Sequence, residues 1–202
     1  MAFNMLTKEK LERLLAGAPK ELAYKGKITA FDFETPNRNA DRACSIGVTV
    51  IERERITGSF EYLMDPETYF DDICISVHGI TPADVEGAPC FPEVWEKIRY
   101  HFETGLVIAH NAGFDLRVLR QLCIHYGNAC PDLRYADTLA ISRAVLGRTV
   151  PNHKLGTLCG CFGIELDAHH AGSDSYGCAA LYLRMLEKAG DLDRFEKIYR
   201  MA

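Results

Sequence analysis

The sequence contains no long hydrophobic run. Apolar residues make up 48% of its 202 residues and charged residues 25%, as in an ordinary globular protein. No apolar stretch approaches the about 18 to 20 residues of a membrane-spanning helix, and residues 6–15 carry charges where a secretion signal would need an apolar segment. We therefore expect a cytoplasmic protein with no membrane partner.

The sequence also has fewer positively than negatively charged residues. The chain has 23 Lys and Arg against 28 Asp and Glu, a formal net charge of −5. This balance disfavours a protein that binds nucleic acid by broad neutralisation of phosphates. It does not exclude a nucleic-acid enzyme, because bound divalent cations can supply positive charge at the site.

The eight cysteines include no C-x-x-C pair, and only Cys159 and Cys161 lie close in sequence. Their spacings, with those of the histidines, match no four-ligand zinc pattern. We interpret them as reduced thiols, mostly small core residues.

Hydrophobic periodicity predicts strands followed by alternating helices and strands. This order is typical of the α/β class, with a mixed sheet of an antiparallel meander and parallel strands covered by helices. We expect an N-terminal helical extension at 1–25, a main domain at 26–190 and a C-terminal tail helix at 191–202, with a loop-like segment at 70–92. The expected strands are 28–33, 44–52, 56–63, 106–109 and 133–136, and the expected helices of the main domain are 91–103, 113–126, 137–146, 153–162 and 173–186.

Acidic side chains follow the apolar runs. Asp32 and Glu34 end the first strand, where residues i and i+2 point to the same face, although an isolated D-x-E can also be a polar strand end. Asp115 and Asp174 each fall in the first turn of an expected helix, where the helix dipole alone would explain an acid. Four carboxylates at one place would repel one another without a cation. Hard oxygen ligands select Mg²⁺ or Mn²⁺, and two such ions suit a phosphodiester substrate.

Six motifs together resemble the DnaQ-like exonucleases of the DEDDh class, which includes the proofreading subunit of bacterial DNA polymerase III and ribonuclease T. The resemblance covers about residues 27–188. The motifs are FDFET at 31–35, HGIT at 78–81, HNAGFD at 110–115, ADT at 136–138, KLGTLCGCFGI at 154–164 and HHAGSDS at 169–175.

The resemblance implies a ribonuclease H-like fold and a metal-dependent 3′→5′ exonuclease that releases nucleoside 5′-monophosphates from DNA or RNA, with 26–190 as its exonuclease domain. It makes four acids the ligands of two divalent cations, Mg²⁺ or Mn²⁺. Asp32 would bridge both ions, Glu34 and Asp174 would complete one site, and Asp115 would hold the other.

The resemblance also assigns the general base and the substrate contacts. His169 would accept the proton of the attacking water, a role that suits a histidine near neutral pH. His170 competes for this role, but the family pattern H-x4-D selects His169. Thr35 and the backbone of Phe33 and Glu34 would hold the terminal 3′-hydroxyl, and His78 would lie near the terminal nucleotide. Asp137 and Thr138 are interpreted as a structural helix cap.

The implied partners are single-stranded or frayed 3′ ends of DNA or RNA, with a DNA polymerase or a repair protein as a further partner. No clamp-binding segment is visible at either end, which weakens the interpretation of the protein as a replicative proofreading subunit. The sequence gives no indication of oligomeric state.

Two other functions fit the sequence less well. Haloacid dehalogenase-like phosphatases need D-x-D-x-T after the first strand, whereas Glu34 and Thr35 break that spacing. A catalytically weak nucleic-acid or partner-binding module that retains the exonuclease fold predicts loss of an acid or of the histidine, and all five are present.

Overall fold

The computed structural model describes residues 26–201, which form one six-stranded mixed sheet in the order β3-β2-β1-β4-β5-β6. β1, β2 and β3 form the antiparallel meander, β1, β4 and β5 are parallel, and β6 is antiparallel to β5. The predicted α/β, ribonuclease H-like sheet is confirmed. The strands are β1 (Ile28–Glu34), β2 (Ser45–Glu52), β3 (Arg55–Leu63), β4 (Leu106–Ala109), β5 (Leu133–Asp137) and β6 (Lys197–Tyr199).

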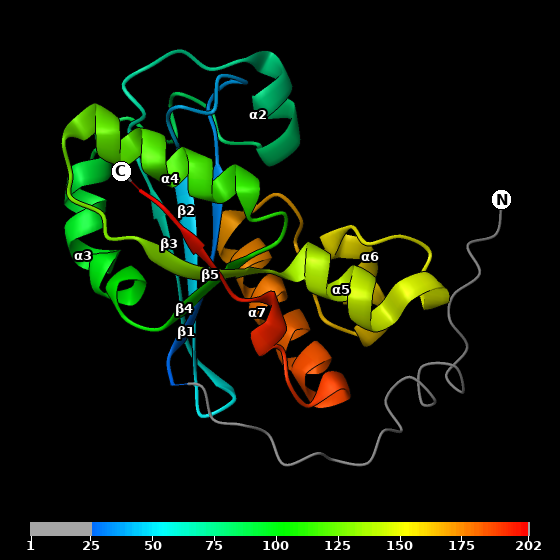
Figure 1. Ribbon diagram of the computed structural model, residues 1–202. Coiled ribbons are helices and arrows are strands. Elements are labelled where there is room, and N and C mark those ends of the chain that lie inside the picture. The colour runs from blue at the N-terminus through cyan, green and yellow to red at the C-terminus, as the bar shows by residue number, and fades with distance from the viewer. Residues whose placement is uncertain (1–25, 202) are drawn as a thin grey trace, which may run out of the picture.

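Helices cover both faces of the sheet, with α3 and α4 on one face and α5, α6 and α7 on the other (Figure 1). None of the described helices is both long enough and apolar enough to cross a membrane. The helices are α2 (Asp72–His78), α3 (Phe91–Glu103), α4 (Gly113–Tyr126), α5 (Thr138–Leu146), α6 (Leu155–Phe162) and α7 (Ala171–Ala189), with short 3-10 turns at Gly147–Thr149 and Asp193–Phe195.

The alternation of side chains along β1 decides where its acids lie. Phe31 and Phe33 pack into the core beneath α3 and α4. Ile28 and Ala30 pack into the core beneath α7. Because side chains two apart share a face, Asp32 and Glu34 continue the face that α7 covers.

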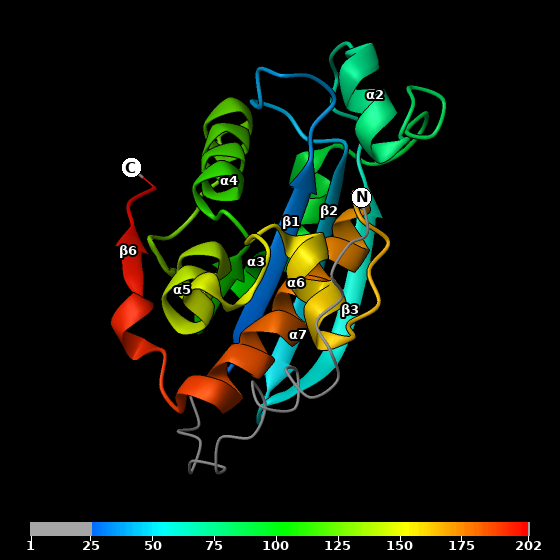
Figure 2. The same cartoon turned by 90° about the vertical axis from the view of Figure 1, so that its right-hand side faces the viewer.

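The sheet opens at the carboxyl end of β1. Parallel pairing between β1 and β4 ends at Ala30 and Ile108, whereas β1 continues to Glu34 beside β2. Figure 2 shows α2 and the segment after β1 lying beyond this end of the strand. In open α/β sheets, the gap beyond the carboxyl ends of diverging strands is where ligands bind.

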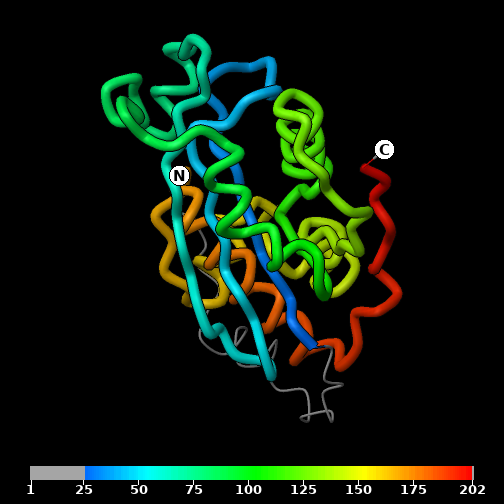
Figure 3. The backbone as a smooth tube through the Cα atoms, turned by 90° about the vertical axis from the view of Figure 1, so that its left-hand side faces the viewer, coloured from blue at the N-terminus to red at the C-terminus, as the bar shows by residue number. Residues whose placement is uncertain are grey.

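Two predictions about local structure are corrected. Within the predicted loop 70–92, residues Asp72–His78 form α2, which Gly79 ends in the left-handed conformation at φ 76°. The predicted tail helix is a 3-10 turn followed by β6, because the edge of β5 offers unpaired backbone groups to a passing strand. Figure 3 shows this C-terminal segment returning along the edge of the sheet. The helix predicted within 1–25 lies outside the described residues.

The cysteines are free, as predicted. Cys44, Cys123, Cys159 and Cys178 are buried and the other four are partly buried. Among the described residues, the one group of side chains spaced to hold a metal ion contains no cysteine.

Candidate active site

Asp115 enters the site from the opposite face of the sheet. It lies in the first turn of α4 and is only 2% exposed. Its Oδ1 accepts a hydrogen bond of 3.1 Å from the backbone N–H of Phe33. The parallel pairing of β1 with β4 ends at Ala30, so the Phe33 N–H has no partner on β4. Asp115 accepts from this N–H instead, and its carboxylate is thereby fixed near Asp32.

Asp174 enters from α7. It lies in the first turn of the helix, is buried, and its Oδ2 accepts a hydrogen bond of 2.9 Å from the backbone N–H of His169. Ligand atoms of Glu34, His169 and Asp174 all lie within 4.8 Å of one another. The three separate sequence segments therefore meet at the open end of β1.

Burial and mutual repulsion strongly perturb the acids. Burial, followed by the charges of Asp115 and Asp174, raises the pKa of Asp32 well above its usual range. Burial and the neighbouring carboxylates raise the pKa of Glu34 to about 8. Burial raises the pKa of Asp115 to about 7, against the opposing effect of its hydrogen bond from Phe33, and burial also raises the pKa of Asp174. Crowded carboxylates of this kind fit hard divalent cations, which remove the repulsion.

We expect the metal-free protein to lose stability as the pH rises from about 5 to about 8. Glu34 and Asp115 bind more protons in the folded state than in the unfolded state, so the stability that they contribute is complete below their unfolded pKa and is lost through pH 7 to 8. In EDTA, the Tm should fall by about 5 to 10 °C over this range, and Mn²⁺ should restore it. Glu34→Gln should flatten the dependence, and an unchanged slope would contradict this origin.

The two adjacent histidines lie on different sides of the site. His169 has a left-handed backbone at φ 67° and is one of the three residues grouped with Glu34 and Asp174. His170 occupies the N-cap position of α7 without a capping hydrogen bond from its side chain, and its Nε2 lies 3.6 Å from a carboxylate oxygen of Asp167. The geometry thus groups His169, not His170, with the acids.

The residues predicted to contact substrate, Phe33, Thr35 and His78, form contacts within the protein. The Phe33 side chain is buried in the core, and the Phe33 N–H donates to Asp115. Thr35 directly follows β1 and is half-buried. The buried His78 donates from Nε2 to the Thr35 carbonyl at 3.2 Å, and its Nδ1 accepts from the Ile80 N–H at 3.0 Å. Both ring nitrogens therefore form hydrogen bonds with backbone groups. Through the bond to Thr35, His78 connects α2 to the end of the strand that carries the acids.

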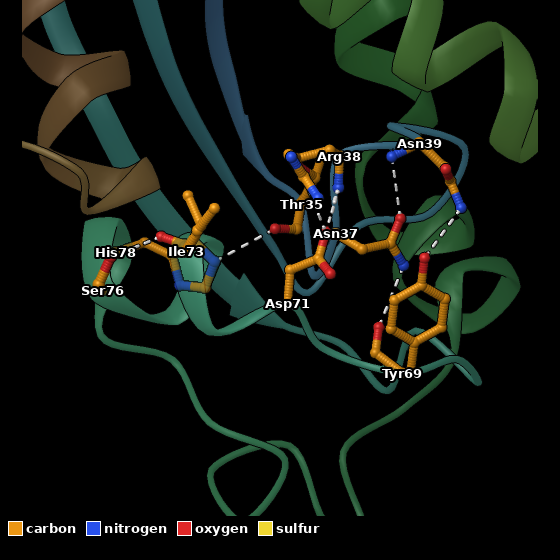
Figure 4. Close-up of polar contacts among 9 residues, drawn as sticks. All are labelled: Thr35, Asn37, Arg38, Asn39, Tyr69, Asp71, Ile73, Ser76 and His78. Atoms are coloured by element: carbon orange, nitrogen blue, oxygen red, sulfur yellow. Dashed lines mark hydrogen bonds and ion pairs between the residues drawn. The ribbon is translucent and has the colours of Figure 1, made fainter.

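Figure 4 shows this connection and its neighbours. Asn37 donates from Nδ2 to the Tyr69 carbonyl at 3.0 Å, and the Arg38 N–H donates to Asp71 at 3.1 Å. The segment after β1 is therefore fixed to the segment before α2. Substrate contact by Thr35 or His78 stays a prediction.

The structural cap is confirmed. Asp137 Oδ1 accepts from the Leu139 N–H at 2.9 Å at the start of α5, and from the Asn111 N–H at 3.0 Å. Asp137 therefore fixes both α5 and the left-handed turn at Asn111, φ 70°, which leads into α4.

A fifth carboxylate, Glu61, was missed by the motif analysis. It stands on the exposed β3 strand, its Oε1 accepts from Ser45 Oγ at 2.9 Å, and its charge raises the pKa of both Asp32 and Glu34. No local pattern distinguishes it from other surface acids, because only the pairing of β3 with β2 brings it near the site.

Gly47 was missed as well, although a glycine inside a strand indicates close approach of another backbone. It pairs with Asp32 across the sheet. A Cβ atom at this position would lie 1.8 Å from the Ala171 carbonyl oxygen. Only glycine therefore allows the N-terminus of α7, with Asp174 three residues further along, to rest on the sheet.

Gly47→Ala should cost about 10²-fold in turnover or more, because a shift of about 1 Å in catalytic groups has effects of this size. The clash is with backbone, so α7 itself must move. The loss should appear in nuclease assays of folded protein, with the fold checked by circular dichroism. Gly58→Ala is the control, because its added Cβ would meet only the side chain of Phe60. Wild-type turnover in Gly47→Ala would contradict the close-packing argument.

Comparison with known proteins shows the family to which the chain belongs. The family model described as exonuclease (RNase_T) matches residues 29–182. A PolC-type DNA polymerase III of Caldanaerobacter subterraneus subsp. tengcongensis is 29% identical over 175 residues, which are 85% of this chain and 12% of that relative. A DNA polymerase III subunit epsilon-like protein of Rhodobacter capsulatus is 31% identical over 183 residues, 87% of this chain and 25% of that protein. The chain thus spans only a small part of these relatives' length.

Solved structures share the fold. Exonuclease X in complex with 5′ overhanging duplex DNA has a TM-score of 0.66 at 21% identity, covering 83% of this chain and 96% of that chain. E. coli exonuclease I with a dT13 oligonucleotide has a TM-score of 0.69 at 18% identity, covering 81% of this chain and 42% of that chain. With the family model matching most of its length, the chain belongs to the exonuclease family and is a DnaQ-like member of it.

Proposed function

We propose that this protein is a metal-dependent 3′→5′ exonuclease of the DEDDh type that releases nucleoside 5′-monophosphates from DNA or RNA. The observation that carries the proposal is the convergence of acids from β1, α4 and α7, together with His169, at the open end of β1. A site that only bound a partner would have no need for this costly concentration of buried carboxylates.

In this proposal, Asp32, Glu34, Asp115 and Asp174 hold two divalent cations, Mg²⁺ or Mn²⁺, which when bound supply the positive charge that phosphodiester hydrolysis requires. His169 accepts the proton of the attacking water at a ring nitrogen. Its exposed position leaves the ring free to pass that proton to solvent. Thr35, which directly follows Glu34, would orient the terminal 3′-hydroxyl.

The relatives suggest a cellular setting. Both polymerase-associated relatives are much longer than this chain, and their names place them with DNA polymerase III. We propose that the substrates are single-stranded or frayed 3′ ends, and that a DNA polymerase or repair protein is the partner. Co-purification with a polymerase would support this partner.

The proposal is tested on 5′-labelled single-stranded DNA and RNA of equal sequence, incubated with Mg²⁺, with Mn²⁺ or with EDTA. A metal-dependent ladder that shortens from the 3′ end, and that a 3′-phosphate blocks, is the expected result. Shortening from the 5′ end would contradict the polarity. Metal binding without cleavage of either polymer would favour the binding module instead.

A further inference from the structure

Beside the candidate site lies a hollow of about 930 Å³ that holds, next to His169 and Asp174, two basic residues with no role in the proposed mechanism. His169 and Asp174 form one wall of the hollow, so it opens directly onto the acids. Another part of the lining comes from α5 and from the start of α6, and Figures 1 and 2 show both helices beside α7. This part is called the second wall. Arg143 and Lys154 belong to this second wall.

These two cations are available to a ligand. Both are exposed, and neither forms a salt bridge with another described residue. The chain as a whole has a net charge of −5. Two unpaired cations in one hollow therefore make this part of the surface locally basic, beside a site proposed to cleave phosphodiesters.

Lys154 is also held in position. Asn152 Oδ1 accepts from the Lys154 N–H at 2.9 Å. The carbonyl of His153 accepts from His110 Nε2 at 2.9 Å, and His153 Nε2 donates to the Gly147 carbonyl at 3.0 Å. The loop that carries Lys154 is therefore fastened to the residue that directly follows β4, close to the turn into α4.

The other side of the site has the opposite charge. A second hollow of about 740 Å³ is lined by Glu61, His78, Asp84 and His170, and no Lys or Arg lines it. The paired histidines separate the two hollows, because His169 lines the first and His170 the second.

We propose that the hollow with Arg143 and Lys154 binds the phosphates on the 5′ side of the scissile bond. This inference rests on the proposed exonuclease function. A 3′-terminal nucleotide carries no phosphate on the 3′ side of its sugar, so this end of the strand tolerates the acidic hollow. The strand on its 5′ side carries one negative charge per nucleotide and needs cations. The difference in charge between the two hollows would therefore set the direction in which a strand enters.

The test compares Arg143→Gln/Lys154→Gln with wild type on two substrates in Mn²⁺. The first is a single-stranded thymidine oligonucleotide, and the second is the p-nitrophenyl ester of thymidine 5′-monophosphate, which has no nucleotide on the 5′ side. The double variant should raise the KM for the oligonucleotide about tenfold or more, and should reduce the slope of log affinity against log salt by about 1.4. Hydrolysis of the ester should be unchanged.

Arg99→Gln is the matched control, since it removes an exposed cation on α3, outside the hollow. Unchanged oligonucleotide affinity in the double variant, or an equal loss on both substrates, would overturn the proposal. Oligonucleotide binding is also measured in EDTA by fluorescence anisotropy. If the wild type hydrolyses neither substrate, the proposed function fails, and the binding measurement still decides whether the two cations hold phosphate.

Discussion

Asp174→Asn is expected to lower phosphodiester hydrolysis by about 10³-fold or more while leaving the fold intact. The substitution removes one of the charges that would hold a divalent cation, and such an ion contributes several kcal/mol to the reaction. An Asn side chain still offers an oxygen to the His169 N–H, which Asp174 accepts at 2.9 Å. The measurement is the rate on labelled single strands in Mg²⁺.

Stability separates this result from simple unfolding. Because burial raises the pKa of Asp174, and burial together with neighbouring acids that include Asp174 raises the pKa of Glu34, removing one charge should raise the Tm of the metal-free protein near pH 8. Asp167→Asn is the control for the rate, because Asp167 is an exposed acid on the segment before α7 with 84% of its side chain accessible. Full activity in Asp174→Asn would remove this residue from the proposed metal site, and a lowered Tm would contradict the electrostatic account.

His169→Ala should lower the rate by about 10² to 10⁴ at neutral pH, the usual contribution of a general base. His170→Ala is the matched control, because the two side chains are adjacent in sequence but only His169 is grouped with Glu34 and Asp174. The rates of both variants are compared on the same single-stranded substrate.

Calorimetry of Mn²⁺ binding distinguishes a base from a ligand. If His169 acts as the general base, His169→Ala should keep its Mn²⁺ affinity, since the carboxylates remain. A parallel loss of affinity and rate would make His169 a metal ligand. A loss of rate in His170→Ala alone would show that the adjacent histidine is the base.

The sequence by itself determined the fold class and the candidate acids. Alternation along β1 puts Asp32 and Glu34 on one face whatever the rest of the chain does, because backbone geometry alone imposes it. Asp115 and Asp174 each lie in the first turn of a helix, which is also a local pattern. Asp137 was recognisable as a cap for the same reason, and its bond to the Leu139 N–H bears this out.

Local patterns failed where a partner from elsewhere in the chain decides the structure. Residues 197–199 form a strand because β5 offers them an edge, and neighbouring residues alone do not contain that information. The motif around the buried His78 did not predict that both of its ring nitrogens bind backbone, and its contact with substrate stays a prediction. Short segments gain their stability from tertiary contacts more than from their own propensity.

The tertiary structure alone decided which charges face one another. Gly47 is an ordinary strand residue until α7 is placed against it, and Glu61 approaches the site only through the pairing of β3 with β2. Arg143 and Lys154 share one hollow because α5 and α6 both pack on α7. Charges interact through space, over distances that depend on how distant segments pack. The sequence therefore identifies the chemical groups of the site, and tertiary packing determines which charges surround each of them.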